Sequence, residues 1–316
     1  MTNDLAPVGL TVYTRVWHTI QCIEALKEND LAKETELYIF SDAAKKGDEH
    51  KVEKMRKYLR TISGFKRVVV IERQENDRVK NNRGGQKYLL DKYGKAIWLA
   101  EDILTSQCFL TFMNEALKFY QDNEKVTFVS GYVIPGIDLE SSQDDVFFLG
   151  RFESWGFAFW KRSFKYFNYI SDAQYKAVYN SKKELKKLSR RIGDEGVYAI
   201  PNDYTGKIDG GDLKVWFWQY IFDTYTLYPR ISLTRSNGLD GSGVHMGITD
   251  KWDIDKLWGK PCQFEFKDVV AIDPSIERMN TSFYKRTLKD RVSLFLQKIR
   301  IHGAVKFFIR KMPKRI

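Results

Sequence analysis

Short apolar runs alternate with amphipathic segments along the N-terminal part of the chain. The apolar runs have the length of buried strands and cover residues 9–14, 36–40, 67–72 and 95–100. Between them, apolar residues three or four positions apart indicate helices, which cover residues 19–27, 50–63 and 85–92. Strands that alternate with helices predict right-handed crossovers and a mainly parallel sheet. We therefore expect an α/β fold whose ligands bind at the carboxyl ends of the strands.

Beyond Asp102 the pattern is less regular. Predicted helices cover residues 106–120, 172–191 and 213–222, and predicted strands cover residues 125–131, 146–150 and 231–235. An aromatic block, WGFAFW, occupies residues 155–160, and a Gly-rich turn sequence occupies residues 237–247. No repeat and no linker rich in Pro, Gly or Ser interrupts the chain. We expect one domain over residues 1–273, with halves at about 1–130 and 131–273, and a basic tail over residues 274–316.

Composition narrows the class of protein. The chain has 316 residues, of which 43% are hydrophobic and 15% aromatic, so disorder over most of its length is excluded. No apolar run reaches the roughly 18 residues of a membrane-spanning helix. The first residues lack the basic start and apolar core of a secretory signal. These features predict a cytoplasmic protein.

The chain has three cysteines, Cys22, Cys108 and Cys262. An odd number at wide spacing suits neither a disulfide framework nor a CxxC metal site. We expect buried free thiols.

The net charge of +11 is concentrated at the C-terminus. Residues 284–316 contain eleven Lys or Arg and one acid, a net charge of +10, so the rest of the chain is almost neutral. Apolar residues in this tail recur at helical spacing, at Leu288, Val292, Phe295, Leu296 and Ile299. This pattern favours an amphipathic helix on an anionic membrane surface, although the stripe could pack on the protein's own core. Binding of nucleic acid is not expected, because its basic footprint belongs on the folded body.

Two adjacent carboxylates, Glu101 and Asp102, follow the fourth predicted strand. At the carboxyl edge of a parallel sheet, such oxygen donors can hold a hard divalent cation against a diphosphate. The pair by itself also fits a helix cap or a salt bridge.

Six separated segments, taken together, resemble bacterial glycosyltransferases of the family 2 type, which have the GT-A fold. They are PVGLTVYTRVWHT (7–19), FSD (40–42), AEDILTSQCFLTFMN (100–114), WGFAFW (155–160), KIDGGDLKVW (207–216) and SLTRSNGLDGSGVH (232–245). The similarity extends more distantly to N-acetylglucosaminyltransferase I. The chain departs from the family's metal motif at two positions: Ala100 replaces the first acid, and Glu101 replaces an aspartate. Residues 75–80 also differ, because they lose a glycine and gain two cations.

The resemblance implies a Rossmann-like GT-A fold that binds a nucleotide-sugar through its N-terminal half and an acceptor through its second half. It places the nucleotide-sugar-binding residues at Tyr13, Arg15, Asp42, Asn76, Glu101, Trp155 and Gly156. It implies that Asp102 and His245 hold Mn²⁺ or Mg²⁺. The chemistry agrees, because a guanidinium matches phosphate oxygens and a carboxylate can accept hydrogen bonds from ribose or base.

An acceptor hydroxyl needs a general base near the anomeric carbon. The resemblance places Asp209 on the family's motif acid, and Asp212 lies three residues later. We expect an inverting displacement with Asp209 as the base and Asp212 as the close alternative. Either acid could instead cap the helix that follows.

The sequence therefore predicts a metal-dependent hexosyltransferase that uses a UDP-sugar. A glycan or lipid-linked acceptor, in bacterial surface polysaccharide synthesis at the inner face of the cell membrane, would account for the basic tail. One alternative is a sugar-phosphate nucleotidyltransferase, although residues 12–19 lack the Gly-rich phosphate loop expected there. Another is a noncatalytic peripheral membrane-binding protein, which would leave the six segments unexplained.

Overall fold

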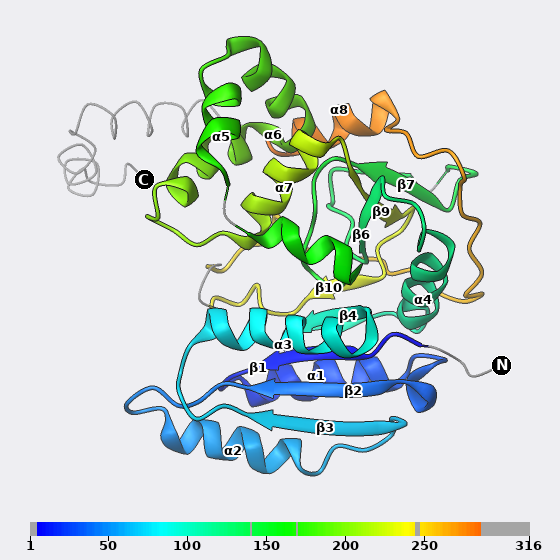
Figure 1. Cartoon of the computed structure of the whole chain (residues 1–316). Helices are drawn as coiled ribbons and strands as arrows, with labels where there is room; N and C mark the ends of the chain where they lie inside the picture. Colours follow the sequence, from blue (N-terminus) through cyan, green and yellow to red (C-terminus); the bar gives the residue numbers. More distant parts are fainter. Residues whose placement is uncertain (1–4, 140, 169, 244–246, 286–316) are drawn as a thin grey trace, which may run out of the picture.

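The computed structural model describes residues 5–139, 141–168, 170–243 and 247–285 (Figure 1). Within them an eight-stranded sheet has the order β3-β2-β1-β4-β8-β6-β9-β7. Its strands are β1 Val8–Val12, β2 Glu36–Ser41, β3 Arg67–Glu72, β4 Lys95–Ala100, β6 Val126–Ser130, β7 Val146–Leu149, β8 Phe157–Trp160 and β9 Tyr225–Pro229. A separate antiparallel pair consists of β5 Ile103–Thr105 and β10 Thr234–Ser236.

Most of the large sheet is parallel. Strands β3, β2, β1 and β4 pair in parallel, as do β6 and β9, whereas β8 and β7 run antiparallel to their neighbours. The predicted α/β fold with a mainly parallel central sheet is confirmed.

Helices cover both faces of this sheet (Figure 1). They are α1 Val16–Lys27, α2 Glu49–Leu59, α3 Arg78–Tyr93, α4 Phe109–Phe119, α5 Asp172–Tyr179, α6 Lys182–Tyr204, α7 Gly211–Phe222 and α8 Pro274–Phe283, with 3-10 turns at η1 Ala32–Glu34 and η2 Lys161–Phe167. Alternate strand residues point to opposite faces. Leu10 and Leu99 therefore pack with α1, α2 and α4, while Phe40 and Trp98 pack with α3, α6 and α7.

Helix α3 begins earlier than the apolar spacing predicts. The Asp77 side chain accepts a hydrogen bond from the Lys80 N–H at 2.9 Å and so caps the helix before Arg78. The two glycines at 84 and 85 lie inside the helix. A Cβ on Gly85 would stand 2.8 Å from Trp98, so the small residue lets α3 pack closely on the sheet.

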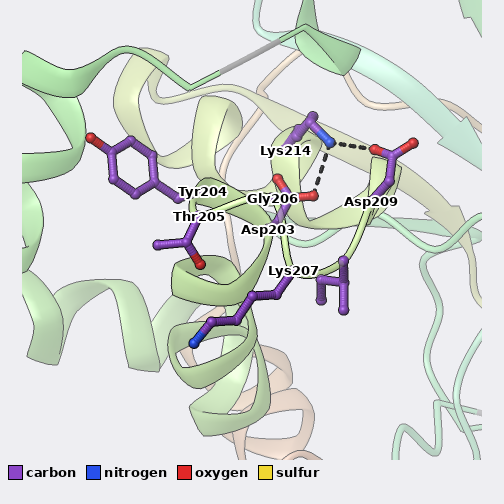
Figure 2. Close-up of a pocket in the computed structure, with 8 residues that line it drawn as sticks. Asp203, Tyr204, Thr205, Gly206, Lys207, Asp209 and Lys214 are labelled. Atoms are coloured by element: carbon purple, nitrogen blue, oxygen red, sulfur yellow. Dashed lines mark hydrogen bonds and ion pairs between the residues drawn. The ribbon is translucent and has the colours of Figure 1, made fainter.

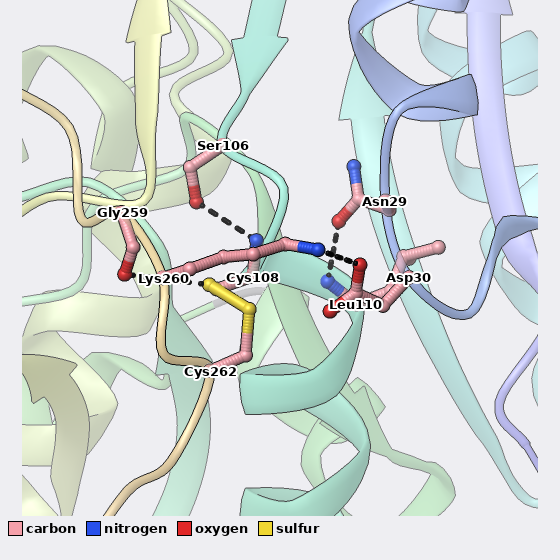
Figure 3. Close-up of a disulfide and its surroundings, with 8 residues drawn as sticks. All are labelled: Asn29, Asp30, Ser106, Cys108, Leu110, Gly259, Lys260 and Cys262. Atoms are coloured by element: carbon pink, nitrogen blue, oxygen red, sulfur yellow. Dashed lines mark hydrogen bonds and ion pairs between the residues drawn. A yellow bond between two sulfur atoms is a disulfide. The ribbon is translucent and has the colours of Figure 1, made fainter.

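The cysteine prediction was wrong for two of the three residues. Cys108 and Cys262 form a disulfide, and Cys22 is a buried free cysteine (Figure 3). Wide sequence spacing gave no sign of the pair, because the fold brings together two residues that are 154 positions apart. The disulfide fastens the segment before α8 to the start of α4. Next to it, Lys260 forms an ion pair with Asp30 at 2.8 Å.

The final described segment packs onto the body of the protein. Helix α8 lies on α6, and the Tyr284 ring is buried against Gly193, whose φ of +80° interrupts α6. The predicted membrane-binding stripe lies almost entirely outside the described residues. In the part of the chain that the structure describes, no helix has both the length and the apolar character needed to cross a membrane.

Candidate active site

Three predicted site residues follow neighbouring strands at one edge of the sheet. Tyr13 follows β1, Asp42 follows β2 and Glu101 follows β4. Strand β1 lies between β2 and β4, so the chain leaves β1 in one direction across the sheet and returns to its other side at β4. Such a switch point is where open α/β sheets form a ligand crevice. The fold therefore brings these residues together where a ligand is expected.

Arg15 joins the two adjacent acids of this edge. Its Nε lies 2.7 Å from Oε1 of Glu101, and its Nη2 lies 2.8 Å from Oδ2 of Asp102. The other Glu101 oxygen accepts the backbone N–H of Tyr13 at 2.7 Å. Both Glu101 oxygens are thus bound by protein donors. Glu101 therefore cross-links the loops after β1 and β4.

Burial sets the charge balance of this cluster. Glu101 is only 7% exposed, and burial raises its pKa above the ordinary glutamate value, although Arg15 opposes the rise. Burial lowers the pKa of Arg15, but Asp102 and Glu101 together outweigh that effect and raise it. The guanidinium is therefore a fixed cation that partly neutralises two acids.

Asp42 and Asn76 are in direct contact. The Asn76 Nδ2 donates to Asp42 Oδ2 at 3.2 Å and to the Ala43 carbonyl at 2.7 Å. The other Asp42 oxygen accepts the Asp77 N–H at 3.1 Å. These bonds hold the loop after β2 against the start of α3. Tyr13 lies at the rim, where its hydroxyl donates to Asp48 at 2.9 Å.

Residues 237–243 form a turn, called the glycine turn below, that covers the cluster of Arg15, Glu101 and Asp102. The Asn237 N–H donates to the Asp102 carbonyl at 2.9 Å, and a Cβ on Gly238 would stand 2.2 Å from Asp102 Oδ2. Glycine is needed at 238 because any side chain would enter the space of that carboxylate. His18 and Asp240 fix the turn from the other side, with His18 Nε2 3.1 Å from Asp240 Oδ2.

Polar atoms without a protein partner lie beneath this turn. In the described residues, Nη1 of Arg15 and both Nδ2 and Oδ1 of Asn237 are buried and make no hydrogen bond. Buried donors and acceptors normally have partners, because leaving one unpaired costs about 1–3 kcal/mol. The arrangement suits a polar or anionic ligand that would supply these bonds.

Trp155 and Gly156 lie beside β10. The Trp155 ring packs on Tyr132, with ring centroids 4.5 Å apart, and its carbonyl accepts the Thr234 hydroxyl at 2.6 Å. Gly156 has a φ of +81°, and a Cβ there would stand 2.8 Å from Thr234. The aromatic block is thus tied to the strand that leads into the glycine turn.

Asp209 lies at the edge of an open surface pocket of about 540 Å³. Lys214 lies between Asp209 and Asp203, with its Nζ 2.6 Å from the first and 2.9 Å from the second (Figure 2). The hydrogen bond from Lys214 lowers the pKa of Asp209, whose side chain is 54% exposed. Asp209 is a solvated ion-pair partner in this arrangement.

Asp212 has a different environment in the first turn of α7. Its Oδ2 accepts the Ser154 hydroxyl at 2.8 Å, and Ser154 comes directly before Trp155. Arg83 from α3 approaches the same turn: its Nη2 lies 1.8 Å from where a Cβ of Gly211 would be. Neither acid caps α7, because Gly210 occupies the N-cap position. Asp212 is the acid that contacts the residue directly before the aromatic block.

The donor set for a divalent metal is incomplete in the described residues. No group of three His, Cys, Asp or Glu side chains lies together there, and His245 is outside the described residues. Asp102 is 18% exposed and has a hard carboxylate, which suits Mn²⁺ or Mg²⁺. Glu101 does not suit a ligand role, since protein donors bind both of its oxygens. The site fits a metal held by one carboxylate and completed by ligand oxygens, as is usual for Mg²⁺ with phosphates.

Four residues near the site had no predicted role, namely His18, Asp240, Ser154 and Arg83. His18 belongs to the first matched segment, so a signal was present for that residue. The others could not be selected, because their importance comes from contacts between distant segments.

Comparisons with known proteins give a limited context. No family model and no curated protein matches the chain. A mannosyltransferase of Pyrobaculum calidifontis, solved with GDP-Man and Mn²⁺, is 15% identical, with a TM-score of 0.34 over 50% of this chain and 44% of its own. Residues 1–349 of TarS from S. aureus are 9% identical, with a TM-score of 0.38 over 71% of this chain and 60% of its own. The chain covers less than two thirds of either structure, and function must be argued from its own residues.

Proposed function

We propose that the chain is a glycosyltransferase that moves a sugar from a nucleotide-sugar donor to a glycan or lipid-linked acceptor. The observation that carries the proposal is the Arg15–Glu101–Asp102 cluster beneath the glycine turn at the switch point of the sheet. The sequence resemblance also supports it, because the residues of the cluster and the turn lie in three of the six matched segments.

The donor nucleotide would lie along the edge formed by the loops after β1 and β2. Asp42 and Asn76 would line this edge, where the hydrogen bond between them fixes the loop after β2, and Tyr13 would border them at the rim. The diphosphate would lie beneath the glycine turn. There the buried Nη1 of Arg15 has no protein partner and can donate to a phosphate oxygen.

Mn²⁺ or Mg²⁺ is the cofactor that this site would use, with Asp102 as a protein ligand and His245 as the second predicted ligand. A bound divalent cation neutralises the charge that develops on a leaving diphosphate. Glu101 would not contact the metal. Its function is to fix Arg15 and the backbone of Tyr13 at the correct distance from Asp102.

Asp212 is a better candidate for the general base than Asp209. Asp209 is solvated and bound to Lys214, whereas Asp212 contacts Ser154 beside Trp155 and Gly156. The positive end of the helix dipole also favours a negative charge in the first turn of a helix. In an inverting displacement, Asp212 would take the proton of the acceptor hydroxyl while the bond to the leaving nucleotide breaks. Trp155 would pack under the sugar ring.

The finer assignments are a UDP-sugar donor, an acceptor in bacterial surface polysaccharide synthesis, and action at the inner face of the cell membrane. The net charge of +10 in residues 284–316 supports the membrane assignment.

The decisive experiment measures binding of a panel of nucleotide-sugars with and without Mn²⁺. We expect one donor to bind in the presence of the metal and to lose at least about tenfold in affinity in Asp102→Ala. Asp122→Ala serves as the matched control and should bind like the wild type. It removes an exposed acid from the loop between α4 and β6. Absence of binding for every donor under every metal condition would refute the proposal.

A further inference from the structure

The first part of α6 has two chemically distinct sides. Leu188 and Ile192 are fully buried in the core between the sheet and α7. On the solvent side, four exposed cations follow one another at helical spacing, namely Lys182, Lys183, Lys186 and Arg190. Residues three and four apart lie on the same side of a helix. We call these four residues the basic ridge.

The charges of the basic ridge are not neutralised by ion pairs within the described residues. Nearby cations do have carboxylate partners there: Lys187 pairs with Glu184 at 2.7 Å, and Lys176 lies 4.0 Å from Asp172. For the ridge itself, no carboxylate of the described residues lies within ion-pair distance, although Glu184 and Glu277 interact electrostatically with Lys183 and Arg190 from farther away. Like charges three or four positions apart on a helix repel one another, and an external anion would relieve this repulsion.

The ridge lies beside the last described residues of the chain. Helix α8 packs on α6, and the Thr281 hydroxyl donates to the carbonyl of Arg190 at 2.6 Å. Tyr284 is buried against Gly193, three residues beyond the ridge. The last described residues therefore lie beside the ridge. Residues 285–316 of the sequence contain eleven Lys or Arg.

We propose that the basic ridge of α6 is a docking surface for an anionic lipid membrane. Long lysine side chains on the outer side of an amphipathic helix can reach phosphate headgroups, and each contributes attraction near an anionic surface. Surfaces that bind single-stranded nucleic acid combine cations with exposed aromatic rings for stacking. The ridge contains no aromatic residue. The exposed ring of Tyr198 belongs to the same helix, but it follows the interruption of α6 at Gly193. A lipid surface is therefore the partner that fits.

Vesicle co-sedimentation of the full chain tests this surface without any assay of activity. The test variant combines Lys182→Gln, Lys183→Gln, Lys186→Gln and Arg190→Gln. We expect it to bind vesicles of phosphatidylcholine and phosphatidylglycerol at least about tenfold more weakly than the wild type. Neither protein should bind pure phosphatidylcholine.

A control variant removes the same number of charges from another part of the surface. It combines Lys46→Gln, Lys54→Gln, Lys57→Gln and Lys66→Gln, all exposed and located around α2, at the opposite end of the molecule from α6 (Figure 1). It should bind anionic vesicles like the wild type. If both variants lose the same affinity for anionic vesicles, the loss follows from net charge alone, and the proposal is overturned.

Three other outcomes also overturn the proposal. They are wild-type binding by the ridge variant, absence of vesicle binding by the wild type, and ridge-dependent binding of single-stranded RNA without binding of anionic vesicles. Circular dichroism should give the same melting temperature for all three proteins, because the substituted side chains are exposed. The result does not depend on the donor-binding experiment, so the two proposals can fail separately.

Discussion

At the scale of single residues, the two candidate bases are separated by their partners. Asp209 and Asp212 are three positions apart, but the first is bound by Lys214 and the second by Ser154. Sequence similarity favoured Asp209, whereas the hydrogen bond with Ser154, next to the aromatic block, favours Asp212. The difference can be measured directly in turnover.

We predict that Asp212→Asn lowers kcat by about 10²- to 10⁴-fold, because the substitution removes the group that accepts the hydroxyl proton. Donor affinity should remain near that of the wild type, since the donor edge is formed by other loops. Asp209→Asn is the matched control and should retain most of the activity. Steady-state kinetics with separate kcat and KM values checks both. A larger loss in Asp209→Asn would restore that residue as the base.

Asp223 provides a prediction about pH and stability. It follows α7 with a φ of 49° and binds Arg191 at 2.9 Å and Lys125 at 3.0 Å. The hydrogen bond from Arg191 is the main cause that holds the pKa of Asp223 well below its usual range. Asn tolerates the same backbone conformation, so Asp223→Asn removes mainly the charge.

A depressed carboxylate pKa adds stability above the unfolded value of about 3.9, and that contribution is lost as the pH falls toward the folded value. Because the side chain is largely exposed, we expect Asp223→Asn to lower the free energy of unfolding by less than about 1 kcal/mol at neutral pH. The difference should narrow in acid. Urea unfolding at pH 7 and at successively lower pH measures it, and a constant difference would contradict the assignment.

Several site residues could be predicted from the sequence because they follow strands. Tyr13, Asp42 and Glu101 lie together because a parallel sheet brings its carboxyl ends to one edge. The partners of these side chains could not be predicted. The bond between Arg15 and Glu101 joins residues 86 positions apart, and nothing local in the sequence specifies it.

At the scale of elements, the glycine turn after β10 lies directly over Asp102 and sets the space available to a ligand there. We predict that Gly238→Ala weakens donor binding at least about tenfold, since its Cβ would stand 2.2 Å from Asp102 Oδ2 and must push the turn or the carboxylate away. Gly247→Ala is the matched control, because a Cβ there meets no atom within 4 Å. Titration with the donor identified in the panel compares the two. Equal affinities would show that the turn does not define the site.

The disulfide between Cys108 and Cys262 fastens the segment before α8 to α4. We predict that replacing both cysteines by serine lowers the free energy of unfolding by about 2–4 kcal/mol. Reductant should destabilise the wild type by a similar amount and leave the double variant unchanged. Three free thiols in a non-reducing mass measurement of the wild type would contradict this pairing.

Element boundaries show where patterns in the sequence were insufficient. The capping contact of Asp77 with Lys80 places the start of α3 at Arg78, although apolar spacing indicated a start at Gly85. The short β5 was missed because its three residues form a strand only by pairing with β10, far away in the sequence.

At the scale of the whole molecule, Tyr284 anchors the last described segment to the body of the protein. Its ring lies 3.4 Å from the Arg151 guanidinium, and its hydroxyl donates to Glu153 at 2.7 Å. Burial raises the pKa of Glu153, so this carboxylate depends on both partners for its charge. Phe283 and Lys285, on either side, give two alternative truncation points.

A chain shortened to end at Lys285 keeps Tyr284 and serves as the reference. A chain ending at Phe283 should lose about 3–5 kcal/mol of unfolding free energy, because a buried ring and the partner of a buried carboxylate are both removed. Thermal unfolding of the two shortened chains tests the difference. Equal melting temperatures would show that Tyr284 does not contribute to stability.

The contact between Arg15 and the glycine turn also has a consequence for synthesis on the ribosome. Strands β1 to β4 emerge early and can pair while later segments are still being made, because domains form progressively from the N-terminus. Gly238 emerges only after strands β1 to β10. A nascent chain halted before that turn could pair Arg15 with its acids but would lack the turn that covers Asp102. The growing polypeptide therefore completes the space beneath the turn only after Gly238 has been made.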